Sequence, residues 1–327
     1  MPRGSRRAEI ALLLASVVVA LLVAEGATRL LSGDARSGYA QLRTGRSQRQ
    51  PINALGYRDL DRVQPKPAGV RRVVCLGDSF TWGVGVLFDD AWPQRIERTL
   101  SRARGERWEA VNLAEPGMNA VQQASRLESE GLGYGPDVVV MAWVLNDSED
   151  EEAAEARRAA KWTEEELRGP TAAEALLDRS ALVRLLRTRV QATLENRRRI
   201  AGYRSMYAES SAGWAAARRA LTAMGGMCRA NGVPFVVVIF PLFANPLDAG
   251  YPFADVHAKV AQAAGEAGAK VVDLLPRYRT VDWRLLVVDG AADEHPNEIA
   301  HRIAAQAIAR AIDEVVPRPT PSAPASR

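Results

Sequence analysis

Short apolar runs alternate with segments of helical spacing over most of the chain, and this alternation limits the possible folds more than any other feature. Each run has the length and β-branched content of a buried strand, and an amphipathic helical pattern follows it. The five runs are RRVVCL (71–76), WEAVNL (108–113), DVVVMAWVL (137–145), PFVVVIF (234–240) and KVVDLL (270–275). Strands that alternate with helices predict an α/β fold, with a parallel sheet covered by helices on both faces.

The remaining segments define the expected domain organisation. The 327 residues suffice for one large domain, which we expect to span residues 71–316. Residues 148–231 form a helical insertion rich in Ala, Arg, Glu and Leu, in which we expect helices around residues 182–199 and 212–230. The insertion is either an elaboration beside the sheet or a cap over the functional site. Residues 32–70 are polar and turn-rich, as expected of a linker, and the Pro- and Ser-rich residues 317–327 predict a disordered tail.

The N-terminus, residues 1–31, predicts a membrane segment. Three arginines precede the uncharged run from Ile10 to Ala24, which is shorter than a full span of about 20 residues. A cleaved signal peptide is the alternative, because Ala24-Glu25-Gly26 has the small residues of a weak cleavage site. We favour an uncleaved transmembrane anchor, which places the large domain outside the cytoplasm.

Charge and cysteine content exclude several classes of protein. The net charge is +4, but the arginines are scattered among acidic residues and no nucleic-acid-binding motif is present. The two cysteines, Cys75 and Cys228, lie in a predicted strand and a predicted helix, so we expect neither a disulfide framework nor a zinc site.

Polar residues follow the predicted strands, where α/β proteins bind their ligands. Four segments contribute them: Asp78 and Ser79, then Gly117 and Asn119, then Asn146 and Asp147, and finally Asp293 and His295 before the last helix. Each of these pairs is common in ordinary turns and helix caps. Their joint order along the chain is what indicates a catalytic site.

The four segments contain the groups needed for acyl transfer. A serine hydroxyl such as that of Ser79 is a weak nucleophile and needs an adjacent base. His295 is the candidate base, since it lies in a predicted loop, whereas His257 and His301 fall within predicted helices. Asp293 lies two residues before His295, and at that spacing its carboxylate can orient the imidazole ring.

An acyl-transfer site also needs donors for the oxyanion. The backbone N–H groups of Ser79 and Gly117 and the side-chain amide of Asn146 are the candidates. Trp82 and Trp143 flank the expected site, where they either stack on a sugar or belong to the core.

The order of these segments resembles the four blocks of the SGNH/GDSL hydrolase superfamily. The blocks read GDSFTWG with Ser79, NLAEPGMN with Gly117, VLND with Asn146, and DEHPN with Asp293 and His295. INALGYRD (52–59) also resembles the segment before the first block in membrane-anchored bacterial members. The resemblance implies a three-layer α/β/α sandwich with a parallel, flavodoxin-like sheet, and hydrolysis or transfer of ester-linked acyl groups without a metal or cofactor.

Two positions depart from the family pattern. Leu145 stands where many members have Gly, and the acid precedes His295 by two residues rather than three, which leaves Asp289 and Glu294 as less favoured alternatives. We therefore expect a serine esterase acting on a small-molecule or carbohydrate ester. The alternatives are an O-acyltransferase acting on envelope polysaccharide and a non-enzymatic envelope protein on the same scaffold.

Overall fold

The computed structural model describes residues 3–31, 51–150, 152, 179–289 and 293–318. The chain divides into two compact units. One comprises residues 1–37 and 158–201, and the other comprises residues 38–157 and 202–327.

The larger unit is built on a five-stranded parallel sheet with the strand order β2-β1-β3-β4-β5. The strands are β1 (Val70–Leu76), β2 (Arg107–Asn112), β3 (Val138–Trp143), β4 (Phe235–Ile239) and β5 (Lys270–Asp273). Every residue of β3 and β4 is buried, which explains why these runs are apolar throughout rather than alternating. The order is that of a flavodoxin-like doubly wound sheet, so the predicted fold class is confirmed.

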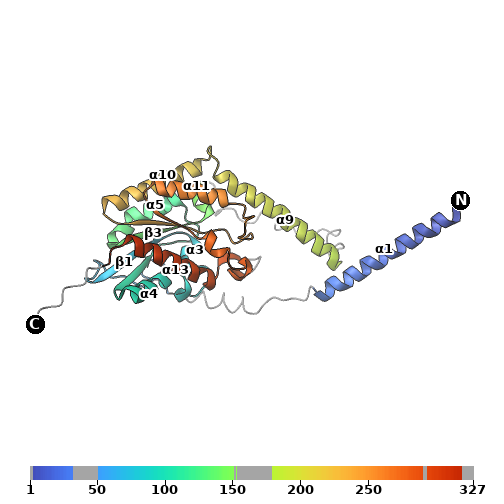
Figure 1. The fold of residues 1–327 in the computed structure, drawn as a ribbon, viewed down its shortest axis with the longest axis horizontal. Coiled ribbons are helices and arrows are strands. Elements are labelled where there is room, and N and C mark those ends of the chain that lie inside the picture. The colour runs from blue at the N-terminus through green and yellow to red at the C-terminus, as the bar shows by residue number, and fades with distance from the viewer. Residues whose placement is uncertain (1–2, 32–50, 151, 153–178, 290–292, 319–327) are drawn as a thin grey trace, which may run out of the picture. The chain divides into compact units, whose positions relative to one another are not determined.

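Helices cover both faces of this sheet (Figure 1). One layer contains α5 (Ala120–Ser129), α10 (Ala212–Ala230) and α11 (Ala254–Glu266), and the other contains α4 (Trp92–Arg104) and α13 (Glu298–Val315). Both cysteines are free and buried, as expected.

A short antiparallel hairpin lies beside the main sheet. It pairs β6 (Val287–Asp289) with β7 (Asp293–Pro296), and β7 contains the segment that we expected to be a loop. Strands of three or four residues are too short to produce a periodic sequence pattern, and their pairing partner is what defines them. The last helix begins after Asn297, whose side chain accepts from the N–H groups of Ile299 and Ala300.

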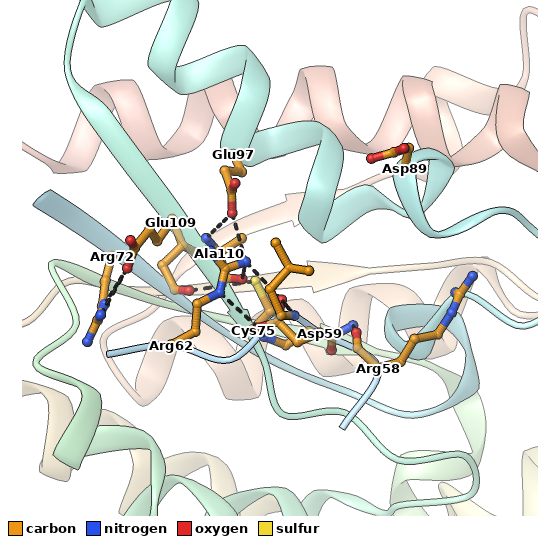
Figure 2. A network of polar contacts seen from close by, with 12 residues as sticks. Arg58, Asp59, Arg62, Arg72, Cys75, Asp89, Glu97, Glu109 and Ala110 are labelled. Atoms are coloured by element: carbon orange, nitrogen blue, oxygen red, sulfur yellow. Dashed lines mark hydrogen bonds and ion pairs between the residues drawn. The ribbon is translucent and has the colours of Figure 1, made fainter. Parts of the chain in front are cut away.

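Part of the segment before β1, predicted to be a linker, packs on the rest of the larger unit. Arg58 and Asp59 are 3% and 1% exposed. Figure 2 shows the Arg62 guanidinium directed at the Asp59 and Glu97 carboxylates, at 2.8 and 2.9 Å, and at the carbonyl oxygen of Ala110. These bonds tie the segment to α4 and β2.

The smaller unit contains the N-terminal helix α1 (Arg3–Leu31). Its stretch Ala8–Leu30 has a mean hydropathy of 2.5 over its most apolar window and is long enough to cross a membrane. This unit also contains most of α9 (Ala181–Met206), one of the two helices expected in the insertion. The other expected helix is α10, which belongs to the larger unit. Two further ranges of the sequence analysis, residues 153–178 of the insertion and the tail beyond Arg318, lie outside the described residues.

Candidate active site

Ser79 lies at the point where β1 turns into the short helix α3 (Ser79–Trp82). The turn needs glycine at position 77 for two reasons. Its φ is +155°, which other residues rarely adopt, and a Cβ there would collide with the side chain of Thr81. Ser79 is half-buried, while the residues on either side of it, Asp78 and Phe80, are buried. The turn therefore presents the serine at the carboxyl edge of the sheet.

Asp78 holds two parts of the site together. Its Oδ1 accepts a hydrogen bond from the N–H of Phe80 at 2.9 Å and so caps α3. Its Oδ2 accepts from Nδ2 of Asn146 at 3.0 Å, a bond between distant segments that the sequence did not indicate. Burial raises the pKa of Asp78, and the hydrogen bonds from Phe80 and Asn146 oppose this effect.

Asn146 is half-buried at the end of β3, in the 3₁₀ turn Leu145–Ser148. Asp147 stabilises the turn by accepting from the N–H of Val144 at 2.7 Å. The Tyr207 hydroxyl donates to the Leu145 carbonyl at 3.0 Å and accepts from Nε1 of Trp143 at 2.9 Å. Trp143 is fully buried in this arrangement, so it belongs to the core and offers no face to a sugar.

The segment after β2 lies along the segment after β1. The N–H of Leu113 donates to the carbonyl of Cys75 at 3.0 Å, and the N–H of Glu115 donates to that of Gly77 at 3.3 Å. Gly117 follows with a φ of +82° and with no atom within 4 Å of the position that a Cβ would occupy. The space beside the Cα of Gly117 is therefore open.

His295 approaches the first segment from β7. It is half-buried, and its ring centroid lies 5.6 Å from that of Phe80. Asp293 begins β7, where its backbone pairs with Asp289, and its side chain lies outside the described part of the structure.

The other two histidines have structural environments. Nδ1 of His257 lies 2.9 Å from Oδ1 of Asp273, and the ring is 1% exposed. Nδ1 of His301 accepts from the N–H of Trp92 at 3.2 Å and so binds the first turn of α4. Burial, with the nearby charges of Arg58 and Arg95, lowers the pKa of His301 to about 3, which keeps the ring neutral.

Arg58 fixes the loop that follows α3. Its guanidinium donates to the carbonyls of Trp82, Gly83 and Val86 at 2.6, 2.7 and 2.6 Å. Burial lowers its pKa to about 10, so the group remains charged at neutral pH. Sequence reasoning missed this residue, since an arginine in a polar segment gives no signal of burial.

Four segments far apart in the sequence thus lie at one edge of the sheet. They bring a half-buried hydroxyl, an open glycine backbone, a side-chain amide and an imidazole to the same region. These are the groups of acyl-transfer chemistry at a serine.

Comparison with known proteins agrees with this chemistry. The model of the GDSL-like Lipase/Acylhydrolase family matches residues 75–303, which is more than half of the chain. No curated protein matches the sequence.

Similar solved structures include three esterases or lipases, each with low sequence identity. A lipase/acylhydrolase from Enterococcus faecalis is 15% identical, with 76% of this chain and 99% of that chain covered and a TM-score of 0.44. An acetyl xylan esterase is 14% identical, with 74% of this chain and 99% of that chain covered and a TM-score of 0.45. The psychrotrophic esterase EstA from Pseudoalteromonas sp. is 14% identical, with 75% of this chain and 97% of that chain covered and a TM-score of 0.42.

Proposed function

Because the chain belongs to the GDSL-like lipase/acylhydrolase family and is an ester-hydrolysing enzyme, we propose that Ser79 is its nucleophile and that His295 and Asp293 complete a catalytic triad. Oγ of Ser79 attacks the ester carbonyl while His295 takes its proton. The tetrahedral intermediate collapses, the C–O bond to the alcohol breaks, and His295 returns the proton to the leaving oxygen. Water, deprotonated by His295, then releases the acid and restores Ser79.

The oxyanion of each tetrahedral intermediate needs donors that are already in position. We assign this role to the N–H groups of Ser79 and Gly117 and to the side chain of Asn146. An amide NH₂ has two hydrogens, and the bond to Asp78 uses one of them. That bond fixes the amide plane and leaves the second hydrogen for the substrate.

The observation that carries the proposal is the convergence of three segments on the turn at Ser79. The first residue after Ser79, Phe80, contacts the ring of His295, and the residue before it, Asp78, binds Asn146. In this proposal Ser79 is the nucleophile, His295 is the base and Asn146 is an oxyanion donor.

The test is ester hydrolysis by purified full-length protein, with p-nitrophenyl acetate as the probe. Ser79→Ala is expected to fold normally and to lose roughly a thousandfold or more in kcat/KM. Ser129→Ala is the matched control, because its exposed hydroxyl bonds only to the carbonyl of Ser125 among the described contacts. Activity near that of the unmodified enzyme in Ser79→Ala would remove Ser79 from the mechanism.

We also propose that α1 is retained as a membrane anchor and that the catalytic unit lies outside the cytoplasm. The apolar stretch Ala8–Leu30 and the three arginines before it support this assignment. A phosphatase that is active only after export, fused after Arg327, is expected to be active. Activity of a reporter that works only in the cytoplasm would contradict the topology, and a mature chain that begins near residue 25 would mean a cleaved signal.

A further inference from the structure

Helix α9 has an uncovered row of apolar side chains. Leu186, Val190 and Leu194 are 57%, 59% and 47% exposed. They are four residues apart, so they lie along one side of the helix, and Leu182 continues the row toward its N-terminus. Single exposed leucines are common on soluble proteins, whereas a continuous row of this kind marks a contact surface.

The same helix is strongly basic. Between Ala181 and Met206 the sequence has seven arginines and one glutamate, a net charge of 7 − 1 = +6. Five of the arginines are exposed: Arg184, Arg189, Arg197, Arg198 and Arg204. An anionic bilayer offers partners for both kinds of side chain. Its acyl chains can bury the apolar row, and its negatively charged headgroups can bind the arginines.

A third observation connects this helix to the apolar helix α1. The carboxylate of Glu25 accepts from the N–H groups of Ala181 and Leu182, both at 2.9 Å, and from the Ser180 hydroxyl at 2.7 Å. Glu25 thereby acts as the cap of α9, and it directly follows the uncharged run Ile10–Ala24. The first turn of α9 is therefore held where the apolar run ends.

We propose that α9 lies on the surface of the membrane that α1 crosses, with the row Leu186, Val190 and Leu194 in the acyl region and the arginines at the phosphates of anionic lipids. The inference rests on the proposal that α1 is retained as an anchor. The Glu25 cap fixes where α9 begins, because Glu25 directly follows the uncharged run Ile10–Ala24. The apolar area and the positive charge of α9 then strengthen the binding to the bilayer that the single helix α1 provides.

The experiment uses full-length protein in vesicles of phosphatidylcholine and phosphatidylglycerol. An environment-sensitive fluorophore is attached at Leu186→Cys or at Glu195→Cys, and lipids brominated on the acyl chain serve as quenchers. Residue 195 is nine positions after residue 186, two and a half turns, so it points to the opposite side of the helix. Cys75 and Cys228 are 0% and 1% exposed, and the chain without an added cysteine controls for their labelling.

We expect brominated lipid to quench the probe at position 186 and to leave the probe at position 195 bright. We also expect the quenching at position 186 to fall when phosphatidylglycerol is omitted, or when Arg189, Arg197 and Arg198 are all replaced by Gln. Equal quenching at the two positions, or none at either, would overturn the proposal. A blue shift of the fluorophore emission at position 186 without quenching would also overturn the proposal, because it would mean that a protein partner covers the row.

Two further readouts test the membrane anchor and the catalytic proposal separately from the role of α9. Retention of the chain in the vesicles after an alkaline wash reports on the anchor alone. Hydrolysis of p-nitrophenyl acetate by the same vesicles reports on the catalytic proposal alone. A chain that is retained and active but shows no quenching at position 186 contradicts only the role of α9.

Discussion

The side-chain amide of Asn146 donates a hydrogen bond to the Asp78 carboxylate, at 3.0 Å, across 68 residues of sequence. Asp78 also caps the helix that begins with Ser79, so one buried carboxylate positions both the serine turn and the amide. This bond makes the relative position of the proposed nucleophile and the proposed oxyanion donor independent of the substrate. Such preorganisation is what gives an oxyanion hole its effect on rate.

Replacing Asn146 with Ala should reduce kcat by about 10²–10³, or roughly 3–4 kcal/mol, with little change in KM. The amide donates to charge that develops only in the transition state, so its loss should not weaken ground-state binding. Steady-state kinetics of ester hydrolysis provide the measurement. A change confined to KM would mean that Asn146 binds the substrate without stabilising the oxyanion.

Replacing Arg58 with Met should destabilise the catalytic unit by about 3 kcal/mol or more, because three carbonyl oxygens would lose their donor. Arg98→Met is the matched control. The Arg98 side chain is 39% exposed and pairs with Asp89, so its loss should cost less than about 1 kcal/mol. Urea unfolding of both variants, followed by tryptophan fluorescence, measures the difference. Equal losses would show that the three carbonyls find other partners.

His301 should make stability depend on pH. Its pKa is lowered to about 3 in the folded protein, while the unfolded chain binds a proton near the ordinary value of 6.5. The unfolded state therefore holds more protons between these values, and stability is lost as the pH falls through this range. From about pH 7 to pH 4.5 the loss from this one residue is about 2–3 kcal/mol.

His301→Gln keeps a side-chain acceptor for the N–H of Trp92 and cannot be protonated in this range. Its free energy of unfolding should therefore fall less than that of the unmodified protein over the same interval. The measurement is urea unfolding at both pH values. An identical pH dependence in the two proteins would exclude His301 as the source.

The main sheet could be predicted from the sequence because its central strands, β3 and β4, are buried on both faces and read as apolar runs. The helical spacing of apolar residues predicted α10 at residues 212–230, where the structure has it. The hairpin of β6 and β7 could not be predicted, since Val287 and Pro296 pair only through tertiary structure. Its discovery changes the setting of His295 from a loop to a strand.

The polar part of the site was harder to predict than the sheet. Ser79 and Asn146 were found by their positions after strands, which the fold brings to one edge. Two contacts could not be predicted from the sequence pattern. They are the bond from Asn146 to Asp78 and the bonds from Arg58 to the carbonyls after α3. Both depend on buried polar groups whose partners lie far along the chain, and periodicity reports only apolar burial.

The acid of the proposed triad can be tested by comparing Asp293→Asn with Asp289→Asn and Glu294→Gln. Asp293→Asn should cost the most activity, because an acid two residues before His295 can orient its ring. The loss should be strongly non-additive with that of His295→Ala, since the two residues act as a unit. A larger loss in Asp289→Asn would transfer the role to that residue. Three small losses would mean that Ser79 and His295 work as a dyad.

The most direct test of the central claim is labelling of the purified full-length protein with a fluorophosphonate, followed by mass spectrometry of its peptides. Only an activated serine reacts rapidly, since the hydroxyl must lose its proton to a base as the phosphorus–oxygen bond forms. We predict a single modified residue, Ser79, with labelling lost in Ser79→Ala and greatly slowed in His295→Ala. Labelling at another serine, or none in an enzyme that hydrolyses esters, would contradict the assignment of Ser79 as the nucleophile.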